Sequence, residues 1–102
     1  MNRYMLSLSL DEIRQQSLVD LQARLRAAAP PEQTAEQHMA WDETVVILRD
    51  TFLGSEHTGQ VFFEFAVPRL GSRIDVVLII DYVVFILEFK TGSGTTSAAA
   101  VD

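Results

Sequence analysis

The chain has 102 residues, enough for a single domain, and its 48% hydrophobic and 22% charged residues exclude a disordered or collagen-like polypeptide. The absence of cysteine excludes disulfide frameworks, thiolate zinc sites and cysteine nucleophiles. Fourteen acidic residues against eight basic ones give a net charge of −6, so the surface is not generally basic and any binding of nucleic acid must use a local site.

Two helices are predicted in the first half of the chain, where the hydrophobic period is helical. The first extends from about Leu10 to Ala28, with Ser9 as its N-cap, and ends because Pro30 cannot continue the helical hydrogen bonding. The second extends from about Thr34 to Leu53 and ends at Gly54. We therefore expect residues 1–54 to form a helical part.

Beyond residue 60 the pattern becomes extended and β-branched, which predicts three strands separated by short turns. They cover Val61 to Val67, Arg73 to Ile80 and Val83 to Lys90. The expected fold is α/β of the α+β kind, with two amino-terminal helices packed on a three-stranded, mostly antiparallel sheet formed by residues 61–90. Residues 91–102 look like the start of a helix that is cut off.

No membrane-spanning or targeting segment is expected. The most apolar stretch, Ile74 to Phe89, is too short to span a bilayer and is interrupted by acidic residues. The amino-terminal segment meets acid early and has no small-residue cleavage site, so we interpret it as folded chain. These features predict a cytoplasmic protein with no membrane partner.

Two acids stand inside runs that otherwise indicate buried strand, namely Asp75 and Glu88. A turn centred on Asp81 and Tyr82 would place these two acids directly opposite each other in the hairpin. Like charges in that position destabilise a sheet, and a divalent cation removes the repulsion. Mg²⁺ is the natural ion, since it needs only one or two carboxylates besides water and phosphate oxygens.

Lys90 lies two residues after Glu88 and so faces the same side of its strand. It is the only lysine, because the other seven basic residues are arginines. An ammonium group there can hold an attacking water or stabilise charge that develops on a phosphate. The competing interpretation is that Glu88 and Lys90 belong to an ordinary solvated strand face.

These residues resemble the motif of the PD-(D/E)XK nuclease superfamily. The resemblance rests on Pro68, on Arg73-Ile74-Asp75, and on Glu88-Phe89-Lys90 after a spacer of twelve residues. The segment L-E-F-K-T-G is similar to its counterpart in RecB-like nucleases. The patterns A-W-x-x-x-x-x-x-L and F-E-F-x-x-P-R-x-G-x-R-I-D-V-V-L resemble the nuclease-like amino-terminal region of bacterial proteins that carry a Schlafen-like helicase or ATPase domain downstream.

The resemblance implies that Asp75 and Glu88 are metal ligands and that Lys90 is the catalytic lysine. Glu64 matches a recurrent acid on the preceding strand and is a further candidate ligand, although a surface strand acid explains it equally well. A five-residue turn at 68–72 would pair Glu64 with Val76, on the wrong face unless a bulge intervenes.

Other polar residues carry weaker expectations. Arg69 and Arg73 are candidate contacts to a phosphate backbone, and Arg73 could instead neutralise Asp75 or Glu88. Glu43 matches the helix acid of some superfamily members, but a solvated helix face is favoured. Surface roles are expected for the two histidines and a core position for the tryptophan, which are His38, His57 and Trp41.

The expected function is Mg²⁺- or Mn²⁺-dependent hydrolysis of DNA by a nuclease-like domain spanning residues 1–102, a partial restriction-endonuclease-like core. Members of the superfamily normally continue with a helix and a strand after the motif, so a fragment without activity is also considered. One alternative is a non-catalytic DNA-binding or helicase-docking module, with a helicase or ATPase domain as partner in cis or in trans. Another is a truncated remnant that self-associates through an uncovered sheet face.

Overall fold

The computed structural model describes residues 3–67 and 71–88 and has an α+β fold. The described elements are three helices and a four-stranded antiparallel sheet in the order β1-β2-β3-β4. Their bounds are β1 Leu6–Ser9, α1 Leu10–Gln15, α2 Leu18–Ala28, α3 Ala35–Phe52, β2 Gly59–Val67, β3 Ser72–Ile80 and β4 Val83–Leu87. The predicted α+β class is confirmed, whereas the predicted numbers of two helices and three strands are each one too low.

The first predicted helix is divided into α1 and α2. Gln16 adopts an extended conformation with ψ 152°, and the Ser17 hydroxyl accepts a hydrogen bond from the backbone N–H of Asp20 at 3.1 Å. Ser17 therefore starts a new helix as its N-cap. The prediction of one helix over Leu10 to Ala28 was wrong because a stripe of apolar residues continues across this break, whereas the local capping interaction interrupts the backbone.

The second predicted helix is confirmed as α3, one residue shorter at each end than expected. The Thr34 hydroxyl caps it by accepting a hydrogen bond from the Gln37 backbone at 3.1 Å. Trp41, Val45 and Leu48 are all buried, so the predicted apolar face of this helix is the face that joins the core. The expected core position of Trp41 is confirmed.

The strand missed in the sequence is β1. It pairs antiparallel with β2, so that Leu6 lies opposite Phe63 and Leu8 opposite Val61. Its four residues alternate between apolar and polar, but this pattern is too short to indicate a strand next to the helix that follows directly. The pairing partner is more than fifty residues away, and only the folded chain brings the two strands together.

The third predicted strand is shorter than expected. β4 ends at Leu87, Glu88 follows outside the ladder, and Lys90 lies outside the described residues. The helix start expected within residues 91–102 also lies outside them.

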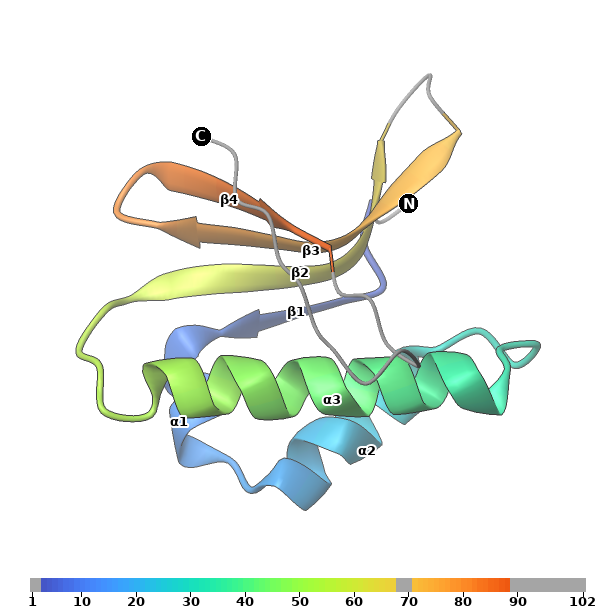
Figure 1. Cartoon of the computed structure of the whole chain (residues 1–102), viewed down its shortest axis with the longest axis horizontal. Helices are drawn as coiled ribbons and strands as arrows, with labels where there is room; N and C mark the ends of the chain where they lie inside the picture. Colours follow the sequence, from blue (N-terminus) through green and yellow to red (C-terminus); the bar gives the residue numbers. More distant parts are fainter. Residues whose placement is uncertain (1–2, 68–70, 89–102) are drawn as a thin grey trace.

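Helix α3 lies along one face of the sheet, and α2 packs on the side of α3 that faces away from the sheet (Figure 1). A single buried cluster joins these layers and involves the inward side chains of three strands and all three helices. The cluster comprises Leu8, Leu10, Ile13, Leu21, Leu25, Trp41, Val45, Leu48, Val61, Phe63, Val76 and Leu78. None of the described helices is long and apolar enough to cross a bilayer.

The β2–β3 hairpin bends sharply where it leaves the sheet, so that its far end projects away from the helices (Figure 1). The bend lies beside Glu64, whose φ of 54° is in the left-handed region. A residue with a side chain in this region costs on the order of 1–3 kcal/mol and persists where the surrounding structure imposes it. This bend sets the geometry of the candidate site.

Candidate functional site

The hairpin register predicted for β3 and β4 is observed over the length of the ladder. Pairing begins at Ile80 and Val83 around a turn at Asp81 and Tyr82, and it ends with Val76 opposite Leu87. The next position on each side is occupied by Asp75 and by Glu88. Asp75 is half-buried in β3, and Glu88 is exposed one residue past the end of β4. The two acids thus follow directly after the last pair of the ladder.

The predicted register of β2 against β3 is wrong by one residue. Phe63, not Glu64, lies opposite Val76, and Phe65 lies opposite Ile74. Glu64 therefore occupies the position opposite Asp75. The expectation failed because Ser72 pairs with Val67 as part of β3, which leaves four connecting residues in place of the five assumed.

Three acids consequently follow one another across three neighbouring chain segments. In the direction from β2 to β4 they are Glu64, then Asp75, then Glu88 at the position after β4. Directly opposed side chains in an antiparallel pair are close neighbours, with Cβ atoms about 5 Å apart in regular geometry. The hairpin pattern in the sequence predicts the second and third of these as neighbours, and the tertiary structure adds the first.

Glu64 itself has the left-handed backbone conformation, and this conformation turns its side chain toward the helices. Trp41 Nε1 on α3 donates a hydrogen bond to Glu64 Oε2 at 3.5 Å, while the preceding residue, Phe63, is fully buried in the same core. Two successive side chains thus share a face, which a regular strand does not allow. The following Phe65 packs edge-on against Phe62, with ring centroids 6.2 Å apart. A local irregularity thereby places a carboxylate under α3.

Burial raises the pKa of the Glu64 carboxyl group, and the nearby charge of Asp75 raises it further. The hydrogen bond from Trp41 and the positive charge of Arg73 act in the opposite direction. The net direction is upward, so the protein environment disfavours the ionised form of this side chain. Electrostatic interaction between Glu64 and Asp75 agrees with their opposed positions in the strand register.

The carboxylates suit a hard cation in their chemistry. Mg²⁺ takes oxygen ligands and needs only one or two of them from a protein. Within residues 3–67 and 71–88, no three histidine, aspartate or glutamate side chains are grouped closely enough to hold a metal ion together. A Mg²⁺ ion bound by two carboxylates and completed by water and phosphate oxygens is the arrangement compatible with this set.

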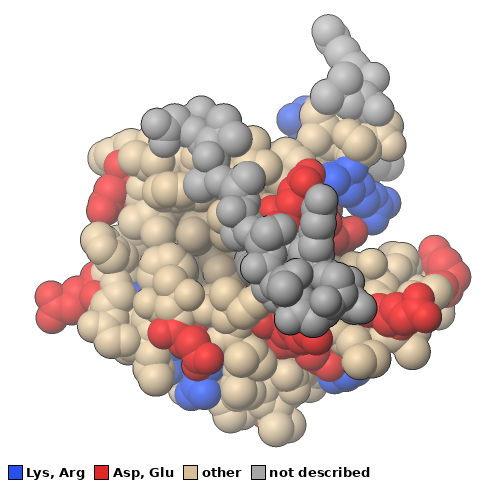
Figure 2. Space-filling view, viewed as in Figure 1, with Lys and Arg blue, Asp and Glu red and all other residues tan. Residues whose placement is uncertain are grey.

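Arg73 lies on β3 opposite Ala66, near the base of the projecting hairpin. It lies close enough to the acids for its positive charge to lower the pKa of Glu64, against the larger effect of burial. Figure 2 shows acidic and basic side chains next to one another in this region of the surface. The other candidate arginine, Arg69, lies outside the described residues.

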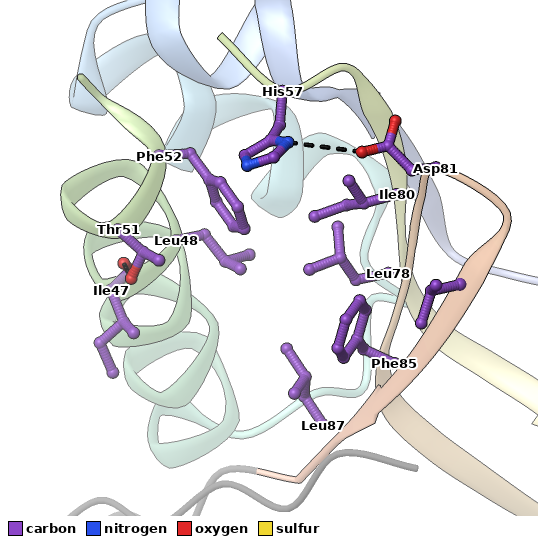
Figure 3. Close-up of a pocket in the computed structure, with 11 residues that line it drawn as sticks. Ile47, Leu48, Thr51, Phe52, His57, Leu78, Ile80, Asp81, Phe85 and Leu87 are labelled. Carbon is purple, nitrogen blue, oxygen red and sulfur yellow. Dashed lines mark hydrogen bonds and ion pairs between the residues drawn. The ribbon is translucent and has the colours of Figure 1, made fainter. Parts of the chain in front are cut away.

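A second concave region, not predicted from the sequence, separates α3 from the β3–β4 hairpin. It is an apolar cleft of about 490 Å³ (Figure 3). The residues that line it are Ile47, Leu48, Thr51, Phe52, His57, Leu78, Ile80, Asp81, Val83, Phe85 and Leu87. At its edge His57 Nδ1 lies 3.5 Å from Asp81 Oδ2, and both side chains are more than half exposed. No spacing in the sequence signals this pair.

The two remaining polar residues considered from the sequence, His38 and Glu43, both lie on α3. His38 is half-buried and packs edge-on against Trp41 at 5.5 Å between ring centroids, so it is less superficial than expected. Glu43 is exposed on α3, as a solvated helix face requires.

No family model, curated protein sequence or solved structure matches the chain.

Proposed function

We propose that the chain is a metal-dependent nuclease domain of the PD-(D/E)XK kind, built on a partial restriction-endonuclease-like core, and that it hydrolyses phosphodiester bonds in DNA. The observation that supports this most is the row of acids set by the strand register. Glu64 lies opposite Asp75, and Asp75 and Glu88 follow the last pair of the β3–β4 ladder. Glu64 and Asp75 are half-buried and Glu88 is exposed, so mutual repulsion opposes folding chiefly between the two half-buried acids, and a bound cation would compensate for it.

In this proposal Asp75 and Glu88 hold Mg²⁺ or Mn²⁺, and Glu64 would add a third ligand only if its side chain turned from Trp41 toward Asp75. When bound, such an ion supplies Lewis acidity toward a phosphate oxygen and lowers the pKa of a coordinated water. Lys90 orients the attacking water from a position two residues after Glu88 in the sequence. Arg69 and Arg73 hold the DNA backbone by contacts to phosphate.

The test is cleavage of supercoiled and single-stranded DNA in Mn²⁺, comparing the natural chain with the variants Asp75→Asn, Glu88→Gln and Lys90→Ala. Each variant should reduce cleavage by about a hundredfold or more, since each removes a group that acts in the same step. Glu56→Gln is the matched control, because Glu56 is an exposed loop carboxylate away from the row. Equal cleavage by the natural chain and Lys90→Ala would refute the mechanism.

A non-catalytic module that docks on a helicase or ATPase domain is the second candidate function. The observations that favour it are the apolar cleft between α3 and the β3–β4 hairpin, lined in part by Val83, and the partly exposed Ile79 and Val84 on the opposite face of the hairpin. These apolar surfaces could also support self-association. A nuclease should gain thermal stability from Mn²⁺, and Asp75→Asn should abolish the gain. A docking module should show no such gain, and a remnant should unfold without cooperativity.

A further inference from the structure

A small polar cavity lies at the base of the projecting β2–β3 hairpin, next to the row of acids. Its volume is about 220 Å³. The residues that line it are Arg3, Tyr4, Met5, Ala28, Pro30, Glu64, Ala66 and Arg73. Two of them are arginines from segments far apart in the sequence, and of these two only Arg73 was among the phosphate contacts predicted from the sequence.

Backbone pairing places Arg3 and Arg73 on either side of the same β2 residue, Ala66. The Arg3 carbonyl accepts a hydrogen bond of 2.6 Å from the Ala66 backbone N–H, and Arg73 lies opposite Ala66 on the other side of β2. Arg3 and Arg73 therefore flank one strand, about 10 Å apart by the usual spacing of strands. The short side chain of Ala66 between them leaves room for a ligand.

The guanidinium group of Arg73 acts electrostatically on the Glu64 carboxyl group, whose pKa it lowers against the larger effect of burial. Negative charge at the cavity comes from Glu64, from Asp75 beside it, and from the carboxyl end of α2, which contributes about half an elementary charge. The net charge of the region therefore does not draw an anion in, and an anion would be held by direct contact with the two guanidinium groups. An arginine side chain offers a planar fork of donors that matches the oxygens of a phosphate group.

We propose that Arg3 and Arg73 form a subsite for a phosphate group of a DNA strand, with Ala66 as its floor. This inference rests on the proposed nuclease function for the identity of the strand, and it adds Arg3 as a substrate-positioning residue. Glu64 lies in the same cavity, so a phosphate held there would be next to the row of acids. The subsite would set how the strand lies relative to Asp75.

The subsite is tested without metal, so that cleavage plays no part in the result. Inorganic phosphate and a 5′-mononucleotide are titrated into the isotope-labelled chain in EDTA, with amide and arginine Nε–H resonances as the readout and acetate as a comparison anion. Saturable shifts at Arg3, Ala66 and Arg73 are expected with both phosphate probes. Arg3→Ala and Arg73→Ala should each weaken binding at least about tenfold, a loss of about 1.4 kcal/mol.

Two further variants distinguish phosphate binding in the cavity from a general effect of positive charge on the protein surface. Arg14→Ala removes the same charge from α1, where Arg14 is paired with Asp11, and should leave phosphate affinity within about twofold of the natural chain. Ala66→Leu keeps every charge but fills the space between the arginines, and it should abolish binding while the amide spectrum stays folded. Absence of saturation in the natural chain, or equal weakening by Arg14→Ala, overturns the subsite.

The kinetics of cleavage of a short DNA oligonucleotide then distinguish this inference from the nuclease proposal. If DNA is cleaved, Arg3→Ala should raise the KM for a short oligonucleotide about tenfold with kcat changed less than twofold, as a positioning residue requires. Cleavage with an unchanged KM would overturn the subsite alone. Phosphate binding in EDTA without any Mn²⁺-dependent cleavage would overturn the nuclease proposal and leave the anion site standing.

Discussion

Trp41 of α3 donates a hydrogen bond from Nε1 to Glu64 Oε2 of β2 at 3.5 Å, and this contact links the main helix to the only strand residue with a left-handed backbone within the described part of the sheet. It holds a half-buried carboxylate beside the acid of the neighbouring strand, Asp75. Because burial and like charge both disfavour ionisation there, the arrangement opposes folding stability when both acids are charged.

Glu64→Gln should therefore raise the free energy of unfolding near pH 8. The pKa of Glu64 is raised in the folded protein above its ordinary value of 4.5, so its contribution to stability is full below about that pH and is lost as the pH rises through the folded pKa. The amide oxygen of Gln still accepts from Trp41. Urea unfolding at pH 5 and pH 8 measures the difference, with Glu56→Gln as the control. A variant less stable than the natural chain at pH 8 would contradict this.

Glu12 should show the opposite pH dependence. The pKa of its carboxyl group is lowered, first by the hydrogen bond from the Ser9 backbone and then by Arg24, 2.6 Å away. Its contribution to stability is present above the ordinary pKa and is lost as the pH falls through the folded pKa. Glu12→Gln should weaken the fall in stability on acidification, as measured by urea unfolding between pH 3 and pH 6. The Ser9 hydroxyl in turn accepts a hydrogen bond from the Glu12 backbone N–H at 3.0 Å, which completes a capping box at the start of α1. An unchanged acid profile would show that this capping box does not stabilise α1.

Leu8→Ala tests whether β1 belongs to the core. Leu8 is fully buried against β2, and truncating a buried leucine costs about 2–5 kcal/mol. Val19→Ala is the control, because Val19 on α2 is 74% exposed and should change stability by less than about 0.5 kcal/mol. Chemical denaturation of both variants compares them. Equal and small effects would mean that the strand is not paired as the structure has it.

Gly59→Ala should destabilise the start of β2. A Cβ atom at Gly59 would lie 2.2 Å from the backbone oxygen of Ile79, closer than atoms can approach, so the paired strands must separate locally. We expect a loss of about 1–3 kcal/mol, typical of a forced steric insertion. Gly54→Ala is the matched control, since nothing lies within 4 Å of the corresponding Cβ. Thermal unfolding of the pair gives the comparison, and a Gly59→Ala variant as stable as Gly54→Ala would be the contrary result.

Much of the candidate site follows from local pattern alone. The two-residue turn at Asp81 and Tyr82 fixes the register of β3 with β4, and a short turn leaves no freedom for a shift by one residue. The alternation of apolar residues identified β2 and β3 within two residues of their ends. The break between α1 and α2 was missed because the spacing of hydrophobic residues gives no sign of the N-cap formed by Ser17.

The position of Glu64 could not be derived in this way. Its register depends on the length of the β2–β3 connection, where one residue more or less reverses which face a side chain takes. Its inward direction further depends on a left-handed backbone at a non-glycine residue, which no sequence pattern indicates. Arg3 likewise approaches Arg73 only because β1 pairs with β2.

By itself, the amino-acid sequence determined the α+β class, the helix α3 and the β3–β4 register, since each arises from periodicity or turn chemistry over a few neighbouring residues. Only the tertiary structure decided that Glu64 turns under Trp41 beside Asp75, and that Arg3 and Arg73 enclose a cavity over Ala66. Those relationships depend on contacts between segments distant along the chain, whose geometry is set by packing and not by local preference.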